Sequence, residues 1–177
     1  MRQLELQQRG LLDLIKGRGA TPDDPYLQMV EGSRELAMMR EIAIWWRKYQ
    51  LEAQCRLTSN LLKRLNCFKG LVTSYFNNHG TSPFVEELSH GFLNFLNGHD
   101  DGLVRTVARF EDALLQLRSG SAATFEVVWD RHPDHVFLAL ENGSELPASE
   151  DDCQYRMLLA ADLPQMVSCT REQLVRN

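Results

Sequence analysis

The spacing of apolar residues changes near Ser119-Gly120-Ser121. Between residues 33 and 118 apolar positions recur every three or four residues, which is typical of helices that bury one face. Beyond that point short apolar or alternating segments predict strands over 124–130, 154–160 and 165–170, with a short helix over 133–142. The pattern therefore predicts an α+β fold, in which a mostly helical N-terminal body carries a small C-terminal antiparallel sheet of about three strands.

The strongest predicted helical stretch covers 34–66, which contains neither Gly nor Pro. Its buried face is predicted from apolar residues at helical spacing: Leu36, Met39, Ala43 and Trp46, widened by Ile42, Trp45 and Tyr49. Thr58-Ser59-Asn60 are expected to divide the stretch, because such side chains bond to nearby backbone and favour caps. Another helix is predicted over 3–17, ending at Gly17 and Gly19.

Three polar signatures predict where later helices begin. Ser82 is expected to cap a helix whose first residue is Pro83, and Asp100-Asp101 to cap the next one. Thr170 is followed three residues later by Gln173, which is the spacing of a capping box. A last helical turn is therefore expected after residue 170.

The change of spacing suggests two domains. We expect residues 1–118 to form a helical docking domain and residues 119–177 a small α/β peptide-recognition domain. Phe125 and Trp129 are predicted to pack back on the helices, so the two domains should share one core.

Charge differs between the two halves of the chain. Residues 1–80 hold 12 basic and 8 acidic residues, a balance of +4, whereas residues 81–177 hold 7 and 16, a balance of −9. Such a split suggests different partners for the two halves. The acidic half argues against nucleic acid as a partner, because it would repel phosphate, although the basic half leaves a DNA-binding regulator as the alternative.

Composition favours a cytoplasmic protein with no membrane partner. No apolar run approaches the roughly 18 residues that a membrane span needs, and the N-terminus lacks the apolar core of a secretory signal. Four cysteines without C-x-x-C spacing are expected to be reduced thiols rather than a disulfide framework.

Candidate metal ligands and catalytic residues are sparse. Glu87 and His90 have the E-x-x-H spacing of helical carboxylate-bridged iron sites, which need a second such pair that is absent here. His132 with His135, and His99 with Asp100-Asp101, are better explained as loop and turn residues. We expect no metal, no cofactor and no catalytic residue in this chain, with an iron enzyme acting through Glu87 and His90 as a weaker alternative.

Arginine and tryptophan predict an interface with another protein. Arg40 and Arg47 are seven residues apart on one helix face, and Trp45 and Trp46 lie beside Arg47. Arginine suits interfaces because its planar guanidinium pairs with carboxylates and stacks on rings. We expect Arg40, Trp45, Arg47 and Lys48 to contact a partner; the alternative is a solvated face with the tryptophans in the core.

The sheet predicts a peptide-binding site. A small sheet has an edge with free backbone donors and acceptors, to which an extended peptide can add as another strand. The side chains expected to contact the peptide lie on the predicted solvent face: Glu126, Val128, Asp130, Arg156 and Leu158. The sequence leaves open which strand forms the edge.

Three segments resemble one family of proteins: 46–55 (WRKYQLEAQC), 82–88 (SPFVEEL) and 103–111 (LVRTVARFE). They are similar to the small partner proteins of multinuclear non-heme iron oxidative enzymes, which modify ribosomally made peptides. The strand over 125–129 and the acidic loop over 145–152 fit the same resemblance, which covers roughly residues 30–170. Within the family the chain is most similar to the partner subunit of the 3-thiaglutamate pathway.

The resemblance implies a division of labour between two chains. The iron would belong to a separate TIM-barrel enzyme, with which the small protein forms a heterodimer. The small protein would help to hold the leader of the precursor peptide, while the enzyme uses oxygen to excise the β-carbon of the peptide's C-terminal cysteine. Because the iron ligands belong to the other chain, the resemblance assigns no catalytic residue here.

Overall fold

A computed structural model describes residues 2–17, 19, 24–79 and 84–174, and it confirms the predicted α+β fold. Contacts between residues divide the chain into two compact units, one of residues 1–50 and 69–80 and the other of residues 51–68 and 81–177. The division does not fall at residues 118/119, because the C-terminal sheet belongs to the same unit as several of the helices before it. The assignment of docking and peptide recognition to 1–118 and 119–177 stays a prediction.

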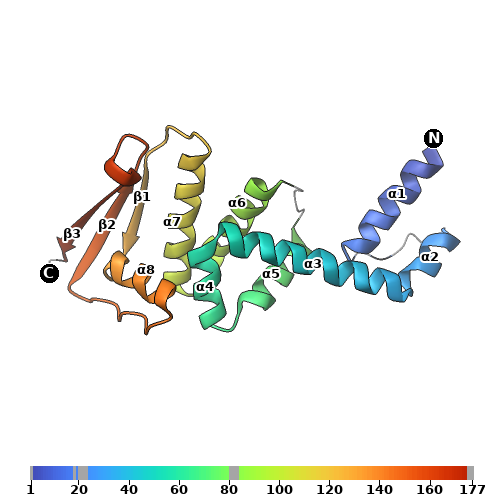
Figure 1. The fold of residues 1–177 in the computed structure, drawn as a ribbon, viewed down its shortest axis with the longest axis horizontal. Coiled ribbons are helices and arrows are strands. Elements are labelled where there is room, and N and C mark those ends of the chain that lie inside the picture. Colours follow the sequence, from blue (N-terminus) through green and yellow to red (C-terminus); the bar gives the residue numbers. More distant parts are fainter. Residues whose placement is uncertain (1, 18, 20–23, 80–83, 175–177) are drawn as a thin grey trace. The chain divides into compact units, whose positions relative to one another are not determined.

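The first unit is helical (Figure 1). It contains α1 (Arg2–Ile15), α2 (Pro25–Glu31), most of α3 (Arg34–Gln54) and nearly all of α5 (Phe68–Asn78). Helix α2 begins after Asp24, whose carboxylate accepts hydrogen bonds from the first free N–H groups of the helix. Leu14, Leu27 and Leu36 are buried together and form a small core between the N-terminal helices.

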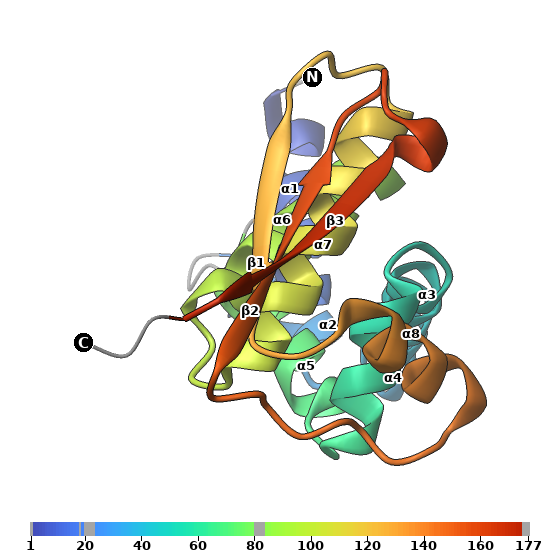
Figure 2. The same ribbon diagram turned by 90° about the vertical axis from the view of Figure 1, so that its left-hand side faces the viewer.

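The second unit combines helices with the sheet (Figures 1 and 2). Its helices are α4 (Arg56–Arg64), α6 (Val85–Phe95), the short η1 (Leu96–Gly98), α7 (Gly102–Arg118) and α8 (Pro133–Asn142). Its strands are β1 (Phe125–Trp129), β2 (Cys153–Leu159) and β3 (Val167–Gln173), with the turn η2 (Pro164–Met166) before β3. Asp101 caps α7 by accepting from the N–H groups of Leu103 and Val104, as the sequence predicted.

The three strands are antiparallel in the order β1-β2-β3. Helix α7 lies against one face of this sheet (Figure 2). The strand residues on that face are buried in β1 and β2, among them Val127, Met157 and Leu159. Trp129 is fully buried, and its ring meets Phe110 of α7 edge-on at 5.8 Å. Strand and helix on either side of residue 119 therefore share a core, because alternating strand residues face the apolar side of α7.

Two predictions about helix boundaries are wrong. The long stretch divides at Cys55 rather than at Thr58-Ser59-Asn60, and both Thr58 and Ser59 are buried inside α4. Residues up to Gln173 belong to β3 instead of a helical turn, because the pairing of Thr170 and Glu172 with β2 satisfies the backbone that a capping box would otherwise serve. Helix α6 begins at Val85, and the predicted cap over 82–83 lies outside the described residues.

Candidate peptide-binding edge and docking face

The predicted peptide-contacting side chains lie together on the sheet face that points away from α7. Glu126 pairs across the strands with Leu158, and Val128 with Arg156, so these four side chains share one face. Asp130 follows directly after β1 and forms an ion pair with Arg131 at 2.7 Å. The grouping of the side chains agrees with the alternating pattern of the sequence.

Arg156 lies at the centre of that face and forms ion pairs with two glutamates. Its guanidinium reaches Glu126 of β1 at 2.5 Å and Glu172 of β3 at 2.9 Å. The hydrogen bonds that Arg156 donates to Glu172, and the charge of both carboxylates, raise the pKa of Arg156. Arg156 thus ties the three strands together, and it belongs to the central strand, whose backbone has partners on both sides.

Backbone pairing shows which atoms are free on β3. The N–H of Ala160 donates to the carbonyl of Met166 at 3.1 Å, and the N–H of Leu174 donates to Asp152 at 3.0 Å. In an antiparallel ladder the pairs that exchange both hydrogen bonds recur every second residue, so even-numbered residues of β3 bond to β2. The backbone N–H and C=O groups that point to the other edge of β3 are those of Val167, Cys169, Arg171 and Gln173.

Strand β3 is the more open of the two edge strands. Within the described residues no strand pairs with its outer edge, and in Figure 1 no labelled element of the second unit lies beyond it. Its residues from Ser168 to Arg171 are exposed on both faces of the sheet. Strand β1 is shorter, and the same alternation leaves only Glu126 and Val128 with backbone groups at its free edge. The open edge for an added strand is therefore β3.

Beside this edge, polar side chains on the α7-facing side of β2 and β3 form a hydrogen-bonded group. Glu150 accepts from Tyr155 Oη at 3.0 Å and from Cys153 Sγ at 2.8 Å, and it lies 3.5 Å from the guanidinium of Arg171. Burial and the bond to Glu150 raise the pKa of Tyr155 to about 12. The bond from Cys153, with that from Tyr155 and the charge of Arg171, lowers the pKa of Glu150. These contacts hold the β2–β3 pair in place beneath its open edge.

Helix α3 carries an exposed apolar face in the first unit, which we name the α3 stripe. Its members are Met38, Met39, Ile42, Trp45, Trp46 and Tyr49, and each is 50–62% exposed. The rings of Trp45 and Tyr49 are stacked at 6.0 Å, and those of Trp46 and Tyr49 at 5.7 Å. Contiguous exposed apolar patches on a protein surface often mark a site of interaction with another protein.

The sequence predicted that most of these residues would be buried, but they are exposed. Leu36 is buried as expected, but Met39 and Trp46 are half exposed. Arg40 and Arg47 face inward: Arg40 Nε donates to the carbonyl of Leu14 at 2.8 Å, and the Arg47 guanidinium lies 4.9 Å from the centre of the Phe76 ring. Burial lowers the pKa of Arg47. The predicted interface residues therefore do not share one exposed surface. Trp45 is exposed, whereas Arg40 and Arg47 contact other residues of the first unit.

The candidate metal ligands do not gather into a site. Within the residues that the structure describes, no group of three or more His, Cys, Asp or Glu side chains could hold a metal ion. His90 bonds through Nδ1 to Asp112 at 2.6 Å, and the rings of His132 and His135 are stacked at 4.7 Å. His99 accepts from the N–H of Asp101 at 3.1 Å, which supports the predicted turn.

Some functional features were not predicted from the sequence. None of the residues at the free edge of β3 was among the predicted contacts. Alternate residues of β2 are buried on one face of the sheet, namely Cys153, Tyr155, Met157 and Leu159, which agrees with the central place of this strand.

No described helix has both the length and the apolar composition needed to cross a bilayer. No protein-family model, curated protein or solved structure matches the chain.

Proposed function

We propose that this chain is a non-catalytic binding subunit that receives an extended peptide on the open edge of β3. The observation that carries this proposal is the row of outward backbone groups at Val167, Cys169, Arg171 and Gln173, on a strand exposed on both faces. A peptide added there would gain main-chain hydrogen bonds, while neighbouring side chains would select its sequence. The peptide is the leader of a ribosomally made precursor, as the sequence resemblance implies.

The docking half of the proposal concerns a second protein. The α3 stripe would contact a TIM-barrel iron enzyme, and the two chains would form a heterodimer in which the barrel supplies the iron. The complex would oxidise the C-terminal cysteine of the precursor and excise its β-carbon. This half is supported by the exposed aromatic cluster of α3 and by the resemblance of the segments over 46–55, 82–88 and 103–111.

A proline substitution tests the peptide edge. The N–H of Cys169 points outward, so Cys169→Pro removes one donor from the free edge without removing a bond to β2. We expect Cys169→Pro to lower peptide affinity at least about tenfold, because a strand-addition bond is lost and the proline ring blocks the approach. Cys169→Ala keeps the N–H and should bind as the wild type does.

The measurement is isothermal titration of the co-expressed precursor peptide, with circular dichroism to confirm the fold. Thr170→Pro is the structural comparison, since its N–H bonds to β2 and its loss should lower the unfolding temperature. Wild-type peptide affinity in folded Cys169→Pro, together with the same result for a proline at Arg171, would exclude strand addition at β3.

Co-expression with the products of the neighbouring genes tests the heterodimer. The iron should co-purify with the larger chain, and this chain alone should hold none. Stoichiometric iron on this chain alone would overturn the subunit assignment. Steeply salt-dependent DNA binding without a protein partner would instead support a DNA-binding regulator.

A further inference from the structure

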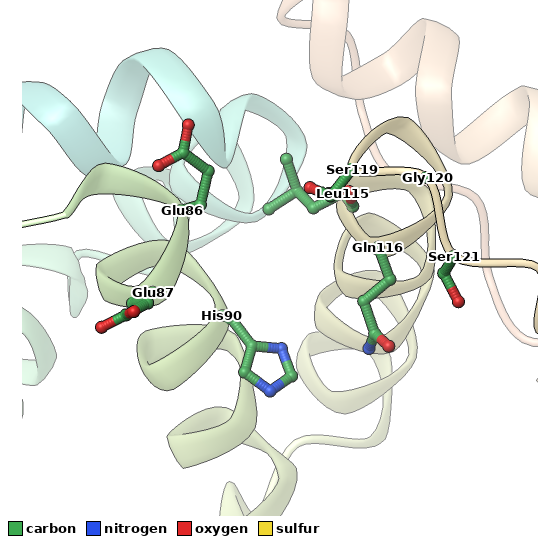
Figure 3. A pocket seen from close by; sticks show the side chains of 8 residues that line it. All are labelled: Glu86, Glu87, His90, Leu115, Gln116, Ser119, Gly120 and Ser121. Atoms are coloured by element: carbon green, nitrogen blue, oxygen red, sulfur yellow. Dashed lines mark hydrogen bonds between the residues drawn. The ribbon is translucent and has the colours of Figure 1, made fainter.

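A second site lies between α6 and α7, away from the sheet (Figure 3). It is a cavity of about 530 Å³, within the range of small-molecule sites. Helix α6 contributes Glu86, Glu87 and His90, and the last turns of α7 contribute Leu115 and Gln116. Ser119, Gly120 and Ser121 complete the wall where α7 ends.

Asp112 is mostly buried and contacts two polar side chains that line the cavity. One carboxylate oxygen of Asp112 lies 2.6 Å from His90 Nδ1, and the other accepts from Gln116 Nε2 at 2.8 Å. The carboxylate therefore orients both side chains. The amide of Gln116 turns its donor toward Asp112 and so leaves its oxygen as an acceptor.

Two glutamates give the cavity negative charge. Glu86 and Glu87 lie in the first turn of α6, and the lining residues within the described part of the chain include no Lys or Arg. The positive end of α6 offsets only about half a unit charge, which is less than either carboxylate carries. The C-terminal end of α7 adds negative potential from the opposite wall. The cavity thus offers acceptors and negative charge beside the apolar side chain of Leu115 and the bare backbone of Gly120.

We infer that this cavity binds an organic cation, an alkylammonium whose charged end lies at Glu86 and the oxygen of Gln116 and whose carbon chain packs on Leu115. A compact metal ion fits less well, since no group of three metal-ligating side chains is placed for one in the described parts of the chain. An alkylammonium needs only acceptors and an apolar wall, and both are present. The same chemistry could belong to a free amine or to a lysine side chain of a polypeptide.

Titration with hexylammonium, followed by amide chemical shifts in the full chain, tests the site. We expect shifts at Leu115, Gln116 and Gly120, and no comparable shifts with hexanoate, which has the same chain and the opposite charge. The double variant Glu86→Gln with Glu87→Gln should weaken hexylammonium binding about tenfold or more, because it removes the nearest formal charges. Glu145→Gln makes a similar charge change on an exposed loop residue and should bind as the wild type does.

N-acetyl-lysine methylamide separates the two sources of the cation. Tighter binding of this probe than of hexylammonium would identify a polypeptide side chain, and weaker binding would identify a free amine. Equal responses to hexylammonium and hexanoate would overturn the inference, as would unchanged affinity in the folded double variant. A thermal melt of each variant verifies that the fold is kept.

Discussion

The side chain of Glu111 on α7 accepts a hydrogen bond from the backbone N–H of Thr58 at 2.8 Å. Its other carboxylate oxygen accepts from the N–H of Leu57 at 2.7 Å. Helix α4 begins at Arg56 and receives no hydrogen bond from the side chain of its N-cap residue, Cys55. A buried glutamate from a distant helix therefore caps α4 by satisfying two of the N–H groups that every helix leaves free at its start.

Replacing Glu111 should destabilise the second unit. Glu111→Gln keeps the size of the side chain but puts an NH₂ group against one of two backbone donors. We expect a loss of about 1–3 kcal/mol in the free energy of unfolding, the cost of a buried donor without a partner. Urea unfolding followed by circular dichroism measures it. Glu141→Gln, on the exposed side of α8, should change stability little, and an equal loss there would contradict the cap.

The ionisation of Glu111 should also make stability depend on pH. Burial raises the pKa of Glu111, and the hydrogen bonds from residues 57 and 58 offset this only in part. Because the folded pKa is raised, the folded state binds the proton more tightly, so this contribution is complete below the ordinary glutamate pKa and is lost as pH rises through the folded value. The stability difference between the wild type and Glu111→Gln should therefore shrink as pH rises. A constant or growing difference would contradict the raised pKa.

Tyr155 should give a second, alkaline dependence. Its pKa is raised to about 12, so its contribution to stability is complete below the ordinary tyrosine value of about 10 and is lost between those two pH values. Urea unfolding in this range should show a steeper loss for the wild type than for Tyr155→Phe. If both proteins lose stability equally, the phenol does not titrate in this way.

Gly10 is a position in α1 where a side chain has no room. A Cβ at Gly10 would lie 2.2 Å from Leu27 Cδ1, and Leu27 is buried in the core of the first unit. We expect Gly10→Ala to destabilise the protein by about 1–3 kcal/mol, since α2 or the leucine must move. Gly70→Ala in α5 meets nothing within 4 Å and should stabilise by about 0.5–1 kcal/mol. Thermal unfolding compares the pair, and a stabilised Gly10→Ala would contradict the close packing of α1 on α2.

The sequence predicted those elements whose signals are local. Asp101 caps α7 as expected, because an aspartate before a helix bonds to backbone only two and three residues away. The face of the sheet that holds Glu126 and Arg156 was also predicted, since strand residues alternate with a period of two. The alternation of strand residues was therefore enough to predict that the expected peptide contacts share one face of the sheet.

Features that depend on distant residues were not predicted. The start of α4 at Arg56 rests on Glu111, more than fifty residues away, so local propensity pointed to Thr58-Ser59-Asn60 instead. On α3, helical spacing identified two faces but could not decide which one is buried. Leu36, Arg40 and Arg47 lie on the inner face, because Leu14 and Phe76 offer partners there, and this leaves Trp45 and Tyr49 outside.

The α3 stripe gives the last prediction. Replacing Trp45 and Tyr49 together by glutamate should abolish co-purification with the iron enzyme, because aromatic residues supply much of the binding energy at interfaces and two buried charges would oppose docking. The unfolding free energy should change by less than about 0.5 kcal/mol for each exposed site, since these rings are more than half exposed. Tyr26→Glu, at an exposed tyrosine of α2 outside the stripe, should leave the complex intact. Retention of the enzyme by the folded double variant would place the docking face elsewhere, and peptide binding at β3 would then stand without the α3 stripe.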